Sequence, residues 1–164
     1  MKKRTAWFGV FTALALIFSY VETLVPVIVG IPGIKLGLAN LVIVIVLYKM
    51  DVKTAALLSV VRVLLAGFLF GNLFSILYSM AGGMLSLLVM AFLQKTNWFS
   101  LIGVSIAGGV CHNIGQLVVA AIVVETFSVT YYIPYLLLAG MVTGMVIGFT
   151  ADKMLEHLKT IKLA

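Results

Sequence analysis

Arg62 is the residue whose position is hardest to explain without a function. It lies near the middle of the stretch 54–70, which is otherwise apolar or made of small residues. A central arginine in a membrane helix costs about 2.5–3.5 kcal/mol on insertion scales, so it faces a protein interior or a wet cavity. Arg62 would then anchor an anionic or carbonyl-bearing ligand, or it would be a structural hub that donates to helix carbonyls and amides. The sequence leaves both interpretations open.

A second polar group lies in the segment CHNIGQ at residues 111–116. His112, Asn113 and Gln116 are spaced three and four residues apart, which places them on one side of a helix. One histidine with neither a second histidine nor a nearby carboxylate is a poor metal site, so we expect no metal and no cofactor. The three side chains would form hydrogen bonds between helices, or they would face a ligand. Three polar side chains on one face of a helix favour the interpretation that they face a ligand.

Further polar residues are expected near one end of the predicted helices. Asn40 begins the second apolar segment, Asn72 and Tyr78 lie where the third segment gives way to the fourth, and Lys35 belongs to the linker 27–37. Proline and glycine in this linker prevent a continuous helix. Together these residues predict a pocket that opens to the outside of a membrane, with Lys35 and the linker as its gate.

Catalysis and nucleic-acid binding have no support in the sequence. Aspartate occurs only at Asp51 and Asp152, whereas a prenyl-transferring enzyme needs aspartate-rich clusters to hold magnesium and diphosphate. The sequence has no GxxxxGK[ST] loop for a nucleotide and no readable Ser-His-acid or Cys-His arrangement. Its 11 lysines and arginines are too few and too scattered for a nucleic-acid-binding face. We therefore predict neither an enzyme nor a nucleic-acid-binding protein.

The composition indicates that lipid surrounds these polar residues. Of the 164 residues, 63% are apolar and 10% are charged, against about 45–50% and about 25% in soluble domains. At about 20 residues per spanning helix, we predict an all-α integral membrane protein of six transmembrane helices. It forms a single transmembrane domain over residues 1–164. The apolar segments are 6–25, 38–48, 54–70, 74–93, 99–124 and 132–151, of which the second is short for a full span.

The basic residues predict the orientation. Nine of the 11 fall at the ends of one side, Lys35 falls on the other side, and Arg62 falls within a segment. Because cytoplasmic loops carry the excess of lysine and arginine, both ends of the chain are predicted to lie inside the cell. The stretch 152–164 places apolar residues at helical spacing among charged ones, which predicts an amphipathic cytoplasmic tail at the membrane surface.

Small residues at every fourth position predict close helix contacts. Gly140, Gly144 and Gly148 form a double GxxxG ladder, and Gly9 with Ala13 forms a weaker version. Such ladders let two helix backbones approach closely. Contact within the chain is the default interpretation, and a face for docking another subunit is the alternative.

Four stretches of the sequence together resemble a known bacterial family. They are KLGLAN at 35–40, RVLLAG at 62–67 running into FGN at 70–72, YSMAGG at 78–83, and AGGVCHNIGQ at 107–116. On these stretches the chain is similar to the Gx transporter family, which is also labelled heptaprenyl diphosphate synthase component I. The resemblance extends from about the linker to the sixth apolar segment.

The resemblance implies a transport function. The family is similar to the substrate-binding S-components of energy-coupling-factor transporters, which are six-helix proteins of the bacterial cytoplasmic membrane with both ends inside. These proteins bind a vitamin or a related small molecule from outside under a gating loop. The implied ligand is a small isoprenoid, quinone or vitamin-like molecule. The implied partners are a transmembrane coupling subunit and two ATPases, although Gly9 and Ala13 depart from the usual docking pattern of the first helix.

The resemblance also implies an alternative. Members are similar to proteins encoded beside genes of quinone synthesis and of flavin-based extracellular electron transfer. The protein would then be a non-transporting accessory membrane subunit in one of these processes. Pull-down with ATPase and coupling subunits, or with quinone-synthesis or flavin proteins, would separate the two functions.

Overall fold

The computed structural model describes residues 2–24, 37–124 and 131–158, and these ranges are helical apart from short connections. The helices are α1 (Lys2–Leu24), α2 (Leu38–Lys49), α3 (Val52–Phe70), α4 (Leu73–Thr96), α5 (Leu101–Val124) and α6 (Ile133–His157). Each overlaps one of the six predicted apolar segments, so the all-helical fold is confirmed. Lys35 and nearly all of its linker lie outside the described residues.

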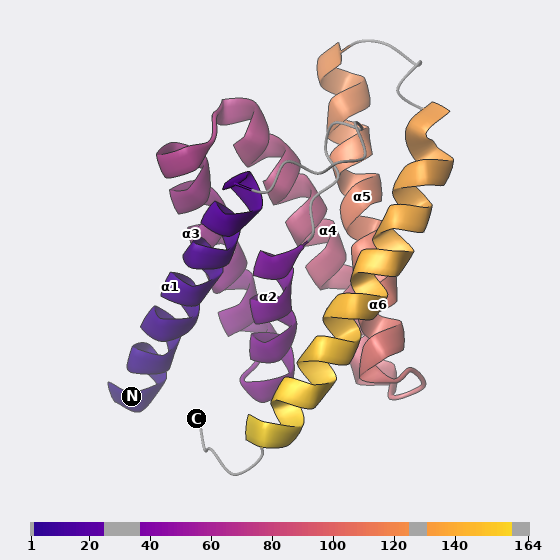
Figure 1. Ribbon diagram of the computed structural model, residues 1–164. Helices are drawn as coiled ribbons and strands as arrows, with labels where there is room; N and C mark the ends of the chain where they lie inside the picture. Colours follow the sequence, from indigo (N-terminus) through magenta and orange to yellow (C-terminus); the bar gives the residue numbers. More distant parts are fainter. Residues whose placement is uncertain (1, 25–36, 125–130, 159–164) are drawn as a thin grey trace.

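The helices alternate in direction along one bundle. The start of α1 and the ends of α2 and α6 lie at the same end of the molecule (Figure 1). Five of the helices are long and apolar enough to cross a membrane, whereas α2 has only 12 residues. These lengths and compositions indicate a multi-pass membrane protein. It stays a prediction that six helices span the membrane and that both ends of the chain lie in the cytoplasm.

The shortest helix is the most deeply buried one. Eight of the 12 residues of α2 are buried, including the unbroken run Leu41–Leu47. A helix that is apolar on all sides belongs inside a core, and α2 packs against α1, α3 and α6. At about 1.5 Å per residue it is only about 18 Å long. Because it is so short, α2 begins well inside the bundle (Figure 1).

Gly37 starts this buried helix in a backbone conformation that favours glycine. Its φ angle is 76°, in the left-handed region, where a Cβ atom would be strained. A Cβ atom there would also stand 2.8 Å from Cδ1 of Ile147 on α6. Gly37 therefore lets the chain turn into α2 while it stays close to α6.

Polar contacts tie helix ends together at the end of the bundle that holds Arg4. Arg4 forms an ion pair with Asp51, whose side chain caps α3 by accepting a 2.8 Å hydrogen bond from the backbone N–H of Thr54. Lys49 donates a 2.5 Å hydrogen bond to the carbonyl of Leu158, just past α6. Residues 152–157 of the predicted tail continue α6, and residues 159–164 lie outside the described ranges.

The glycine ladder of α6 packs against α5 of the same chain. A Cβ atom on Gly140 would stand 2.8 Å from the carbonyl oxygen of Gly109, and one on Gly144 would stand 2.7 Å from that of Ser105. Gly148 is similarly close to the α5 backbone. The two helices therefore approach closely through this ladder, which is the default interpretation of the sequence pattern.

The small residues of α1 have a different environment. Gly9 has no atom within 4 Å of the position where its Cβ would be, and both Gly9 and Ala13 are exposed. Val10 and Ile17 on the same helix are 55% and 57% exposed. This face of α1 is open within the described part of the chain.

Candidate functional site

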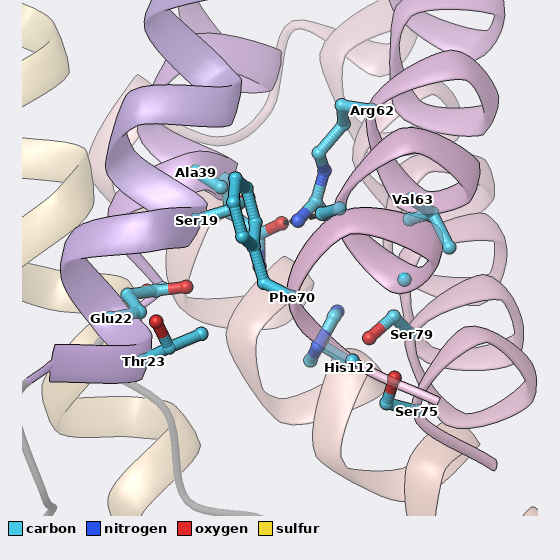
Figure 2. A pocket seen from close by; sticks show the side chains of 15 residues that line it. Ser19, Glu22, Thr23, Ala39, Arg62, Val63, Phe70, Ser75, Ser79 and His112 are labelled. Carbon is cyan, nitrogen blue, oxygen red and sulfur yellow. Dashed lines mark hydrogen bonds between the residues drawn. The ribbon is translucent and has the colours of Figure 1, made fainter. Parts of the chain in front are cut away.

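A cavity of about 180 Å³ lies among five of the six helices. Its walls come from the end of α1, the start of α2, the second half of α3, the first turns of α4 and the middle of α5 (Figure 2). It lies in the half of the bundle away from the start of α1. The lining residues are Ser19, Glu22, Thr23, Gly37, Ala39, Asn40, Arg62, Val63, Ala66, Gly67, Phe70, Gly71, Ser75, Ser79 and His112.

Arg62 is the central polar residue of this cavity. Its side chain extends from α3 toward the middle of the lining (Figure 2), and the residue is only 7% exposed. Nη2 donates a 2.9 Å hydrogen bond to Oδ1 of Asn40 on α2. The buried Nε atom has no hydrogen-bond partner among the described residues. Asn40 thus holds one side of the guanidinium, and another of its donors is left unpaired.

Glu22 supplies the charge opposite to Arg62. It lines the cavity from α1 and interacts electrostatically with Arg62. Its Oε1 accepts a 2.6 Å hydrogen bond from the backbone N–H of Leu38, the first residue of α2. Gly37, at the N-cap position, has no side chain with which to cap the helix. Glu22 therefore takes over the capping of α2, where the helix dipole favours a negative charge.

Sequence reasoning missed Glu22, because a glutamate near the predicted end of a helix is explained by solvation at the interface. Its partner Leu38 is 16 residues away along the chain. The available signal was the glycine before the second apolar segment. A buried helix that starts after glycine needs an acceptor from elsewhere for its first N–H groups.

Hydroxyl groups and an imidazole complete the polar lining. His112 comes from α5, Ser75 and Ser79 come from α4, and Ser19 and Thr23 come from α1 (Figure 2). Ser19 Oγ is buried and has no hydrogen-bond partner within the ranges that the structure describes. Most buried polar atoms in proteins are paired, so Ser19 Oγ and Arg62 Nε, which lack partners among the described residues, are exceptions.

An aromatic pair lies where α1 passes the end of α3. Tyr20 and Phe70 have ring centroids 5.0 Å apart, with the rings tilted by 47°. Phe70 lines the cavity and Tyr20 is 45% exposed. The pair therefore gives this side of the cavity an apolar wall.

Two of the predicted residues on α5 face neighbouring helices instead of the cavity. Nδ2 of Asn113 donates a 2.6 Å hydrogen bond to the carbonyl of Leu136 on α6. Gln116 is 8% exposed and lies against Gly82 of α4, where an added Cβ atom would stand 2.8 Å from Cγ of Gln116. His112 is the member of the group that lines the cavity.

Asn72 and Tyr78 also lie outside the lining. Asn72 forms a capping box with Ser75, in which Oδ1 accepts a 2.9 Å hydrogen bond from the Ser75 backbone and Ser75 Oγ accepts one of 3.0 Å from the Asn72 backbone. Tyr78 is partly buried on α4. Lys35 lies in the part of the chain that the structure does not describe. Of the predicted site residues, Arg62, Asn40 and His112 meet at the cavity.

The lining can orient a polar molecule through hydrogen bonds and charge. It offers one guanidinium, one carboxylate, one imidazole, an amide and several hydroxyls. Among the residues that the structure describes, no three His, Cys, Asp or Glu side chains are grouped so that they could hold a metal ion. The site therefore has the groups of a binding pocket.

The family model for heptaprenyl diphosphate synthase component I matches residues 11–154. This match covers most of the chain. The chain belongs to this family. The resemblance that four sequence stretches carry is thereby confirmed for the family label. No curated protein and no solved structure matches the chain.

The matched region of this component I protein contains every residue that lines the cavity. It also contains the glycine ladder between α5 and α6 and most of α1. The name of the family describes one component of a synthase, which implies a further component as a partner. The apolar helices point to the lipid bilayer as the surroundings.

Proposed function

We propose that this component I protein is a membrane-embedded substrate-binding subunit that resembles the S-components of energy-coupling-factor transporters. It takes up a small molecule from the outer side of the bacterial cytoplasmic membrane. The proposal rests on one observation: Arg62 is buried at a cavity, and its Nε–H has no hydrogen-bond partner among the described residues. Asn40, His112 and Glu22 share that cavity and act with Arg62 on the ligand.

The Nε–H of Arg62 is a buried donor for which the described part of the chain supplies no acceptor. A buried donor left without an acceptor costs about 1–3 kcal/mol, so an acceptor on a bound molecule would lower the free energy of the folded protein. The cavity has a suitable size. Its volume is about 180 Å³, and an engineered apolar cavity of about 150 Å³ is known to hold benzene. A molecule about the size of a single ring therefore fits.

The placement of basic residues supports uptake from outside. Lys3, Arg4, Lys49, Lys53 and Lys95 lie at the end of the bundle that holds the chain's start. By the positive-inside rule that end is cytoplasmic. The cavity lies in the opposite half, so it would open to the outer side. The linker 27–37, with Lys35, would form the gate.

The open face of α1 is proposed to dock a transmembrane coupling subunit, which two ATPases would drive. Gly9 and Ala13 are exposed there beside Val10 and Ile17. Small residues on a membrane helix allow a second helix to approach closely. The protein itself is proposed not to be an enzyme, because its sequence lacks aspartate-rich clusters and a nucleotide-binding loop.

Mass spectrometry of small molecules extracted from the purified protein tests the binding function. Protein prepared in mild detergent is expected to carry a compound that Arg62→Met protein lacks. Arg4→Met, which removes an arginine far from the cavity, is the matched control and is expected to retain the compound. The same extract from all three proteins would contradict the proposal.

The family name favours a second candidate function. A synthase component could act as a non-transporting accessory membrane subunit in quinone or isoprenoid metabolism, or in flavin-based extracellular electron transfer. Pull-down from detergent-solubilised membranes separates the two candidates. Recovery of coupling and ATPase subunits supports transport, and recovery of a second synthase component or flavin proteins supports the accessory function.

A further inference from the structure

We infer that the cavity selects an uncharged ligand with a carbonyl-type oxygen that accepts a hydrogen bond from Arg62, and that it disfavours diphosphates and other anions. The inference rests on the proposed binding function and adds the chemical class of the ligand. It starts from two opposite charges that face the same cavity, Arg62 on α3 and Glu22 on α1.

The charges of the described lining cancel. Arg62 and Glu22 are the only lysine, arginine, aspartate or glutamate residues among the described residues that line the cavity. The negative charge of Glu22 is stabilised further because it accepts from the first N–H of α2. An uncharged ligand leaves this balance unchanged. An anion would add a buried negative charge for which the described lining holds no further cation, since Arg62 is already balanced by Glu22, and such a charge is unfavourable.

The unpaired groups specify an acceptor on the ligand. A guanidinium has donors only, so the Nε–H of Arg62, which has no partner within the described ranges, can be satisfied only by an acceptor. Ser19 Oγ is also unpaired among the described residues and can donate as well. A carbonyl oxygen has two lone pairs and carries no formal charge. It meets the need for an acceptor without disturbing the balance between Arg62 and Glu22.

The remaining lining suits the body of a ring. Val63, Ala66 and Phe70 of α3 also line the cavity, and the Phe70 ring packs on Tyr20. The helix α3 therefore contributes apolar side chains to the lining as well as Arg62. Figure 2 shows the Arg62 guanidinium, the Phe70 ring and the Glu22 carboxylate around this one space. The ligand would direct its oxygen toward Arg62 and its ring toward Phe70.

Four probes separate charge from hydrogen bonding. Benzamide, benzoate and toluene share one ring but differ in their acceptor and charge, and inorganic diphosphate is an anion without a ring. Dissociation constants are measured by NMR on the purified full-length protein in mild detergent. Benzamide is expected to bind at least about tenfold more tightly than benzoate or toluene, and diphosphate is expected not to compete with it.

A charge substitution at Glu22 should reverse the preference between benzamide and benzoate. Glu22→Gln keeps an oxygen that can accept from Leu38, but it leaves the positive charge of Arg62 unbalanced. Benzoate is then expected to bind at least about tenfold more tightly than benzamide. Glu156→Gln, on an exposed part of α6, is the control and should keep the wild-type order. Arg62→Met should reduce benzamide binding to the level of toluene.

The possible failures have different meanings. If wild-type protein prefers benzoate or diphosphate, or if folded Glu22→Gln protein keeps the wild-type order, the ligand class is overturned and the binding function stands. If none of the four probes shows binding that depends on Arg62, the proposed function is contradicted as well. If Glu22→Gln does not fold, the wild-type order of the probes decides the inference by itself.

Discussion

Arg62 on α3 and Asn40 on α2 are joined by a 2.9 Å hydrogen bond from Nη2 to Oδ1. This contact links the helix that carries the buried charge to the short helix at the centre of the bundle. It fixes one edge of the guanidinium, and no described residue pairs with Nε. The helix packing and the candidate binding site therefore depend on the same pair of side chains.

Replacement of Asn40 by leucine should lower stability through Arg62. The change leaves Nη2 without its acceptor in a buried position, which is expected to cost about 1–3 kcal/mol. Thermal unfolding in mild detergent measures the loss. In an Arg62→Met background, Asn40→Leu should cost less than half as much, because the donor is already gone. An equal cost in both backgrounds would show that the contact contributes nothing.

Replacement of Glu22 by leucine should loosen the start of α2. The Leu38 N–H loses its 2.6 Å partner, and loss of a helix cap costs about 0.5–2 kcal/mol. Hydrogen exchange at Leu38 is therefore expected to be several-fold faster. Glu22→Gln retains an acceptor and should exchange at nearly the wild-type rate. Equally fast exchange in both variants would mean that charge, and not the cap, holds this helix start.

Asn113 is expected to contribute to packing and His112 to binding. Asn113→Leu removes the 2.6 Å hydrogen bond to Leu136 on α6, and such bonds between membrane helices average about 0.6 kcal/mol with a maximum of about 1.7. Its benzamide affinity should equal that of wild type. His112→Ala should weaken benzamide binding, because His112 lines the cavity. Weaker benzamide binding by Asn113→Leu and unchanged binding by His112→Ala would indicate that Asn113, and not His112, contacts the ligand.

Replacement of a glycine by valine should be tolerated on α1 but should destabilise the protein on α6. Gly144→Val would drive side-chain atoms against the α5 backbone near Ser105, and overpacking of this kind costs about 1–3 kcal/mol. Gly9→Val is the matched control, since no atom lies within 4 Å of its Cβ position. The temperature of thermal unfolding should therefore fall only for Gly144→Val. If α1 docks a coupling subunit, Gly9→Val should instead lower the recovery of that subunit in a pull-down.

The number and the approximate limits of the helices could be predicted from the sequence. Apolar segments separated by proline, glycine and charged residues leave few alternatives when lipid surrounds the chain. Arg62, Asn40 and His112 could be singled out one by one, because a polar residue within an apolar segment is costly. The structure places these three around one cavity.

The neighbour that each polar side chain faces could not be predicted. The spacing predicts that His112, Asn113 and Gln116 lie on one side of α5, but helix packing decides which neighbour each side chain contacts. Asn113 donates a hydrogen bond to α6, and Gln116 lies against α4. Glu22 was missed because its partners, Leu38 and Arg62, are distant in sequence. Asn72 followed by Ser75 three residues later was a readable capping signal, since asparagine is a preferred N-cap residue.

An experimental structure of the full-length protein, purified in mild detergent from its own membrane, would show whether a ligand occupies the cavity at Arg62. We expect non-protein density in the cavity, with an acceptor atom within hydrogen-bond distance of Arg62 Nε. A cavity filled by side chains of residues 25–36, with one of them accepting from Nε, would contradict the binding function and make Arg62 a structural hub.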